Sequence, residues 1–158
     1  MKRRICAASY SSGLPETVTS TSDTFTLPRW TERHYAAMAD VLLIETDVQL
    51  TRLIEWIIEG AGHQVRTVAR PPDARTELAA AAPDIVVFNS GASRDEKRLL
   101  IRSFRDIVPG LRVIDMDENA SHPSHDTGAD DYIDKPFHAD DLIAAIERLA
   151  RQRTEQDT

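Results

Sequence analysis

Short apolar runs alternate along the chain with longer stretches in which apolar residues recur three and four positions apart. Uninterrupted apolar runs of this length are typical of strands buried on both faces of a sheet. The predicted strands are residues 41–44, 65–69, 85–88, 111–116 and 132–133.

The stretches between these strands have the period of amphipathic helices. Helices are predicted to begin near Leu50, Ala74, Asp95 and Asp140. The apolar stripe of the first helix consists of Leu50, Leu53, Ile54, Ile57 and Ile58, and that of the third helix consists of Leu99, Leu100, Phe104 and Ile107.

Strands that alternate with helices in this way predict an α/β fold, with a parallel sheet covered on both faces. The connection after the fourth strand, residues 117–127, is polar and contains Pro123. A helix at this place is therefore expected to be short. In such sheets the functional site lies beyond the carboxyl ends of the strands.

The chain divides into three parts by composition. Residues 8–28 contain 10 Ser or Thr among 21 residues and have no periodicity, so residues 1–38 are predicted to be a disordered tail. Residues 39–151 form the predicted domain, and residues 152–158 a polar C-terminal tail. Because the sequence from Met38 opens directly into a strand, residues 1–37 are alternatively a mis-assigned start.

Charge separates the same parts. The chain has 19 Lys and Arg against 26 Asp and Glu, a net charge of −7. Residues 1–38 carry +2 and the remainder −9. This balance argues against binding to nucleic acid or to an anionic membrane. The single cysteine, Cys6, and the absence of a long apolar run in the sequence favour a cytoplasmic protein.

Polar residues follow the predicted strands where a site is expected. Glu45, Thr46 and Asp47 follow the first strand, and Asn89 ends the third. The fourth ends near Asp115 and Asp117. If these carboxylates converge, they suit a divalent cation, with Asn89 as a further oxygen ligand. The alternative is that they are solvated acids on separate loops.

The segment GADDYIDKPF at residues 128–137 resembles the corresponding segment of response regulator receiver domains. Two shorter segments, GAGHQV at residues 60–65 and PDIVVF at residues 83–88, support the resemblance. The resemblance implies a flavodoxin-like, doubly wound five-stranded sheet of (βα)5 type. It also implies phosphoryl transfer from a histidine kinase to an aspartate after the third strand, with Mg²⁺ held by two acidic residues.

The sequence departs from this family at the residues that carry the chemistry. Asn89 stands at the phosphoacceptor position, and an amide cannot form an acyl phosphate. Thr46 replaces one of the two metal-binding acids beside Glu45. Met116, or Asp115 with a slip of one residue, stands where the family has Thr or Ser. Lys135 keeps the family's identity, as does Tyr132 at its aromatic switch position.

These departures predict a degenerate receiver that is not an enzyme and needs no cofactor. Mg²⁺ held by Glu45 and Asp47 remains the alternative. The expected function is a stand-alone, phosphorylation-independent protein-interaction module in two-component signalling. Its expected partner is a histidine kinase, another response regulator or a second copy of itself. Two other hypotheses remain open: a metal-assisted phosphoryl acceptor with a displaced carboxylate (Asp47 or Asp115), and a small-anion sensor that uses Lys135.

Four further expectations concern individual side chains. Without a phosphoryl group, Lys135 is expected to pair with Glu45 or Asp115. Trp56 lies off the inward stripe of its helix and is expected to be partly exposed, as an interface anchor or under a neighbouring segment. His122 and His125 are expected to be surface loop residues. A row of arginines on the third helix is interpreted as a solvated face or as a docking stripe: Arg94, Arg98, Arg102 and Arg105.

Overall fold

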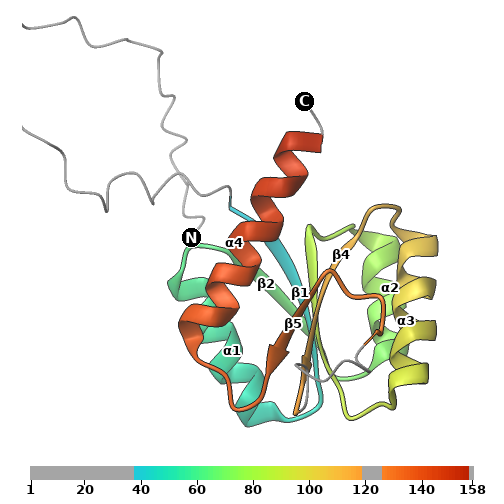
Figure 1. The fold of residues 1–158 in the computed structure, drawn as a ribbon, viewed down its shortest axis with the longest axis horizontal. Helices are drawn as coiled ribbons and strands as arrows, with labels where there is room; N and C mark the ends of the chain where they lie inside the picture. Colours follow the sequence, from blue (N-terminus) through green and yellow to red (C-terminus); the bar gives the residue numbers. More distant parts are fainter. Residues whose placement is uncertain (1–37, 119–125, 157–158) are drawn as a thin grey trace, which may run out of the picture.

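The computed structural model describes residues 38–118 and 126–156 and shows a sheet between two helical layers (Figure 1). Its elements follow one another as the sequence predicts. They are β1 (Asp40–Glu45), α1 (Val48–Gly60), β2 (Gln64–Val68), α2 (Pro71–Ala80), β3 (Ile85–Asn89), α3 (Arg94–Ile107), β4 (Arg112–Asp117), β5 (Asp131–Asp134) and α4 (Ala139–Gln156).

The five strands are parallel and lie in the order β2-β1-β3-β4-β5. The flavodoxin-like doubly wound fold is thus confirmed. Residues of β1 and β3 at the carboxyl edge lie in register, so that Glu45 is beside Asn89. Phe88 of β3 pairs in the same way with Asp115 of β4.

Successive side chains of each strand enter opposite layers, because side chains alternate across a strand. One core lies under α1 and α4 and includes Leu43, Val87 and Met116. The other lies under α2 and α3 and includes Ile44 and Phe88. Figure 1 shows these two helix pairs on opposite faces of the sheet.

Two helices facing this sheet begin with side-chain caps. Asp47 is the N-cap of α1, and its Oδ1 accepts hydrogen bonds from the backbone N–H groups of Gln49 and Leu50. Ser93 begins α3 in a capping box with Glu96. These bonds satisfy N–H groups that have no partner within the helix.

The predicted helical stripes are only partly correct. Leu53 and Leu99 were expected to face inward, but their side chains are 49% and 67% exposed. Ile54, Ile58, Ile101 and Phe104 fill the space beneath these helices instead. The second predicted strand, residues 65–69, corresponds to β2, which is an edge strand with no fully buried residue.

The predicted short fourth helix falls largely on residues 119–125, which lie outside the described residues, as do His122 and His125. Residue 118 and residues 126–130 contain no helix. The predictions for residues 1–37 also lie outside the described part of the chain. None of the helices formed by the described residues is sufficiently long and apolar to span a membrane.

Candidate functional site

Asn89 and Glu45 are in direct contact at the carboxyl edge of the sheet. Both side chains are buried, with exposed fractions of 2% and 6%. The Asn89 Nδ2 group donates a hydrogen bond to the Glu45 carboxylate. The Asn89 carbonyl oxygen, Oδ1, is buried and has no hydrogen-bond partner among the described residues. An amide therefore occupies the place where a receiver of the resembled family has its acceptor carboxylate.

The second acidic residue after β1 has a structural function. The Asp47 carboxylate caps α1, and its backbone N–H donates to Glu45 Oε1 at 2.7 Å. Thr46 between them is exposed. Within residues 38–118 and 126–156, no three His, Cys, Asp or Glu side chains come close enough to hold a metal ion together.

Asp115 belongs to a buried network beneath α3. Lys97 Nζ lies 2.8 Å from Asp115 Oδ1 and 2.8 Å from Asp117 Oδ2. Lys97 is 1% exposed, and Asp115 is fully buried. Asp115 has this partner because it points to the same face of the sheet as Val113, towards α2 and α3. Met116 points to the opposite face and packs in the core under α1 and α4.

Burial of Lys97 by itself would lower the pKa of the ammonium. Its hydrogen bonds and charge interactions with Asp115 and Asp117 outweigh that effect, so the pKa of Lys97 is raised from its ordinary value. Lys97 therefore stays charged at neutral pH. The ammonium neutralises carboxylates at the strand end from within the protein.

Thr127 completes the network from the segment before β5. Its hydroxyl donates to Asp115 Oδ2 at 3.0 Å and lies 3.5 Å from the Tyr132 hydroxyl. Thr127 is 1% exposed, whereas Tyr132 is half-buried. A hydroxyl chain thus joins the buried ion pair to the residue at the aromatic switch position.

The sequence analysis did not identify Lys97 or Thr127 as members of the site. Lys97 could have been found, because it occupies the inward side of α3 together with Ile101 and Phe104. A lysine on such a stripe needs a buried acidic partner. Thr127 carries no comparable local signal, because its partner Asp115 lies on the other side of the β4–β5 connection.

Lys135 does not form the ion pairs expected for it, so that prediction is wrong. Asp115 is paired with Lys97, and Glu45 is bonded to Asn89. The Lys135 backbone N–H donates to the Asp117 carbonyl at 2.8 Å. Its ammonium has no ion-pair partner among the described residues.

The arginine row on α3 largely stabilises the protein's own chain. Arg98 donates to the Asp126 carbonyl at 2.6 Å. Arg105 donates to the Gly128 carbonyl at 2.7 Å and to the Asp130 carboxylate at 2.8 Å. Two of the four arginines thus fasten the segment before β5 to α3. Arg98 and Arg105 are thus engaged within the protein, whereas Arg102 is exposed without an ion-pair partner among the described residues, and the docking-stripe interpretation of the row stays a prediction.

An open groove of about 370 Å³ lies between β5 and α4. Its lining is mainly polar and includes three acidic residues, with apolar side chains such as Ile133 and Ala145 among them. The lining residues are Asp131, Tyr132, Ile133, Asp134, Pro136, Asp141, Ala144, Ala145 and Arg148. Arg148 is paired with Asp131.

The fold is that of CheY-like receiver domains. The structure aligns with the response regulator receiver domain protein (CheY-like) from Methanospirillum hungatei JF-1, with a TM-score of 0.65 and 24% identity, over 75% of this chain and 99% of that one. It aligns similarly with the chemotaxis protein CheY4 of Vibrio cholerae, with a TM-score of 0.60 and 18% identity, over 72% and 99% of the two chains. A further similar structure is NtrX from Brucella abortus, solved in complex with ATP, with a TM-score of 0.67, 25% identity and coverage of 76% and 28%.

Sequence similarity points to the same class. The chain is 29% identical over 118 residues to the transcriptional regulatory protein PhoP of Escherichia coli K12, covering 72% of this chain and 53% of PhoP. It is 27% identical over 121 residues to the virulence transcriptional regulatory protein PhoP of Salmonella typhimurium, with coverage of 74% and 54%. No family model matches the sequence. The chain thus has the fold of response regulator receiver domains and is similar in sequence to response regulators, and it spans about half the length of these curated relatives.

Proposed function

We propose that this receiver domain acts in two-component signalling as a protein-interaction module that is not phosphorylated on aspartate. The contact between Asn89 and Glu45 carries the proposal. The side-chain amide of Asn89 is a much weaker nucleophile than a carboxylate. Its Nδ2 group donates a hydrogen bond to the neighbouring Glu45 carboxylate. The geometry therefore leaves neither a nucleophile nor an unengaged acidic pair at this point.

The Lys97 network supports the same conclusion. In phosphoryl transfer, a metal ion and a lysine neutralise charge that develops on the phosphoryl oxygens. Here the Lys97 ammonium is paired with both Asp115 and Asp117, so these carboxylates are engaged within the protein. The domain is therefore suited to hold one conformation and to be recognised in it.

The groove between β5 and α4 is the proposed contact surface. Its lining combines acidic residues with some apolar side chains, a composition that suits a partner segment carrying basic and apolar side chains. The partner classes under this proposal are a histidine kinase, another response regulator or a second copy of the chain.

Phosphorylation is tested by incubating the full chain with Mg²⁺ and a small phosphodonor, followed by intact-mass measurement. We expect no added phosphoryl group. A stoichiometric, acid-labile phosphoryl adduct would overturn the proposal, and peptide mapping would then identify the displaced carboxylate. Asp115 is poorly placed for that alternative, because it is fully buried and bonded to Lys97 and Thr127.

The contact surface is tested with a matched pair of variants. Ala144→Trp fills the groove, whereas Ala79→Trp adds the same bulk to an exposed position of α2. Affinity capture from cell extract with the unmodified chain, followed by the two variants, should show loss of the captured partner only for Ala144→Trp. Equal capture by both variants would exclude the groove.

A small-anion sensor is a second candidate, because the Lys135 ammonium has no ion-pair partner among the described residues. Under this hypothesis, phosphate or sulfate should raise the melting temperature of the full chain. Lys135→Met should abolish that shift. The same shift in the variant would exclude Lys135 as the anion-binding group.

A further inference from the structure

A second cavity, whose lining combines polar and apolar groups, lies at the amino end of the sheet, far from the Asn89 edge. Its volume is about 440 Å³, and it lies where β1 and β2 begin. The lining residues are Asp40, Glu59, His63, Gln64, Val65, Arg66 and Ala81. His63 is the deeply buried polar residue among them, with an exposed fraction of 6%.

The hydrogen bond to His63 fixes its tautomer. The Ala39 backbone N–H donates to His63 Nδ1 at 3.2 Å, so this nitrogen carries no proton. The neutral imidazole must then carry its proton on Nε2. Nε2 is buried and has no hydrogen-bond partner among the described residues. A buried N–H donor of this kind requires an acceptor from outside the described part of the molecule.

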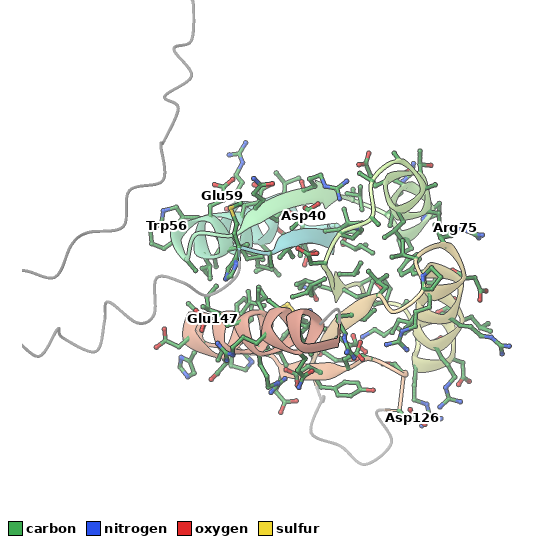
Figure 2. The ribbon with its side chains drawn as sticks, turned by 90° about the horizontal axis from the view of Figure 1, so that it is seen from above. Asp40, Trp56, Glu59, Arg75, Asp126 and Glu147 are labelled. Atoms are coloured by element: carbon green, nitrogen blue, oxygen red, sulfur yellow. The ribbon has the colours of Figure 1, made fainter. Side chains whose placement is uncertain are left out.

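The charges around the cavity favour a cationic occupant. Asp40 is already paired with Arg66, at 3.0 Å. Glu59 at the end of α1 is exposed and forms no ion pair with any described residue. Glu147 of α4 also acts electrostatically on His63, although this carboxylate is itself paired with Arg151 at 3.6 Å. Figure 2 shows Glu59 and Glu147 at the same end of the molecule.

Exposed apolar side chains stand beside these acids. Trp56 and Met38 are 73% and 64% exposed. Trp56 is labelled next to Glu59 in Figure 2, on the same helix. An occupant of this cavity would need a carbonyl acceptor for His63, a basic side chain for Glu59 and an apolar side chain beside Trp56. A short basic peptide segment offers all three groups.

We propose that residues 29–37 of this chain, with the sequence RWTERHYAA, bind across the cavity. A backbone carbonyl of the segment accepts the His63 Nε2 proton, and Arg33 pairs with Glu59. The chain reaches the described domain at Met38, one residue before the Ala39 N–H that holds His63. Met38 lies five positions after Arg33 in the sequence, which allows a reach of roughly 17 Å.

Covalent attachment favours this occupant over a separate peptide, because it gives the segment a high effective concentration at the cavity. The charges are also complementary. Residues 1–38 carry +2, and the remaining residues carry −9.

The sequence offers a direct reporter, because the chain has two tryptophans, Trp30 in the segment and Trp56 on α1. In a full-length Trp56→Phe chain, Trp30 is the sole tryptophan. Acrylamide quenching of its fluorescence should be weak in the folded protein. Adding Glu59→Lys should raise the quenching constant to the value of the urea-unfolded chain, whereas Asp106→Lys, on the exposed side of α3, should not.

A charge exchange makes the test specific. Arg33→Glu alone should also expose Trp30, and Arg33→Glu combined with Glu59→Lys should restore its protection. Glu59→Gln gives a second, milder variant for which partial exposure is expected, should Glu59→Lys reduce folding as judged by circular dichroism. Equal quenching of Trp30 in the folded and unfolded Trp56→Phe chain would overturn the proposal.

Two further outcomes bear on the occupant. Protection of Trp30 that disappears on dilution would show that the segment binds a second copy, and would overturn binding within one chain. A His63 Nε2 proton detected by NMR, slow to exchange in the unmodified chain and fast in Arg33→Glu, would support it. Fast exchange in both chains would exclude the hydrogen bond to His63.

Discussion

Lys97 of α3 and Asp115 of β4 form an ion pair with 2.8 Å between Nζ and Oδ1, and both side chains are almost completely buried. The pair holds a helix to the strand that ends at the functional edge of the sheet. The Lys97 ammonium also donates a hydrogen bond to Asp117, and the Asp115 carboxylate also accepts one from the Thr127 hydroxyl. The network joins α3, β4 and the segment before β5 at this edge of the sheet.

Removing the Lys97 ammonium should destabilise the domain strongly. Lys97→Met leaves Asp115 as an uncompensated buried charge, which typically costs about 3–5 kcal/mol of unfolding free energy. Urea denaturation at neutral pH measures this loss. Arg102→Met is the matched control, because Arg102 is an exposed residue of the same helix without an ion-pair partner in the described structure. It should change stability by less than about 0.5 kcal/mol.

A double variant separates charge from packing. Lys97→Met with Asp115→Asn removes the buried charge as well as the ammonium, so part of the lost stability should return. If the double variant is no more stable than Lys97→Met, the loss comes from packing, and the electrostatic explanation is wrong.

Restoring the acceptor carboxylate should also destabilise the protein. Asn89→Asp places a second carboxylate against Glu45, and neither can then donate to the other when both are ionised. A loss of about 1–3 kcal/mol is expected, as for other unsatisfied buried polar groups. The double exchange Glu45→Gln with Asn89→Asp restores an amide–carboxylate contact. Urea denaturation without Mg²⁺ should show recovery in this variant.

Asn89→Asp alone should not restore efficient phosphorylation. Thr46 is exposed in place of an acid, and Met116 lies in the core rather than at the edge. Neither residue supplies the missing metal ligand or hydroxyl. Incubation with Mg²⁺ and a small phosphodonor, read by intact mass, checks this. Rapid stoichiometric labelling would show that the pocket needs only the carboxylate.

Stability should decrease at mildly acidic pH because of His63. Burial lowers the pKa of His63 below its ordinary value of 6.5, and Glu147 opposes the shift only partly. The unfolded chain therefore binds a proton at a pH where the folded chain does not. The stabilising contribution is complete above 6.5 and is lost progressively as the pH falls from 6.5 towards the folded pKa.

Urea denaturation at a series of pH values checks the sign. His63→Asn retains an acceptor for the Ala39 N–H but cannot titrate, so it should flatten the dependence. His138→Gln, at an exposed position, should leave the dependence intact. A dependence that survives in His63→Asn would assign it to another group.

The Thr127 hydroxyl should couple the buried network to Tyr132. Thr127→Val removes the donor to Asp115 Oδ2 and is expected to cost about 1–3 kcal/mol, whereas Thr127→Ser keeps the hydroxyl and should cost less. NMR of the Tyr132 ring should show a changed environment in Thr127→Val and a smaller change in Thr127→Ser. Identical Tyr132 signals in all three proteins would contradict the coupling.

The order of helices and strands follows from the sequence because hydrophobic period and strand length are local properties. The buried strand at residues 85–88 and the helix that ends before Pro109 and Gly110 needed no tertiary information. Whether Leu53 and Leu99 are buried or exposed could be decided only from the tertiary structure. Both residues fit a helical stripe, but which side of that stripe meets the sheet depends on how the helix lies against its neighbours.

The position of Asn89 at the end of the third strand could likewise be predicted from the sequence, because the identity of a residue at a strand end is local information. The partners of the charged groups could not. Lys135 was the nearer candidate for Asp115 by resemblance, yet Lys97 has that place, because α3 lies over the face of β4 to which Asp115 points. The sequence alone determined the fold and the presence of an amide, Asn89, at the end of the third strand. Only the tertiary structure decided which cation neutralises the strand end, since ion pairs between distant residues depend on the packing of whole elements.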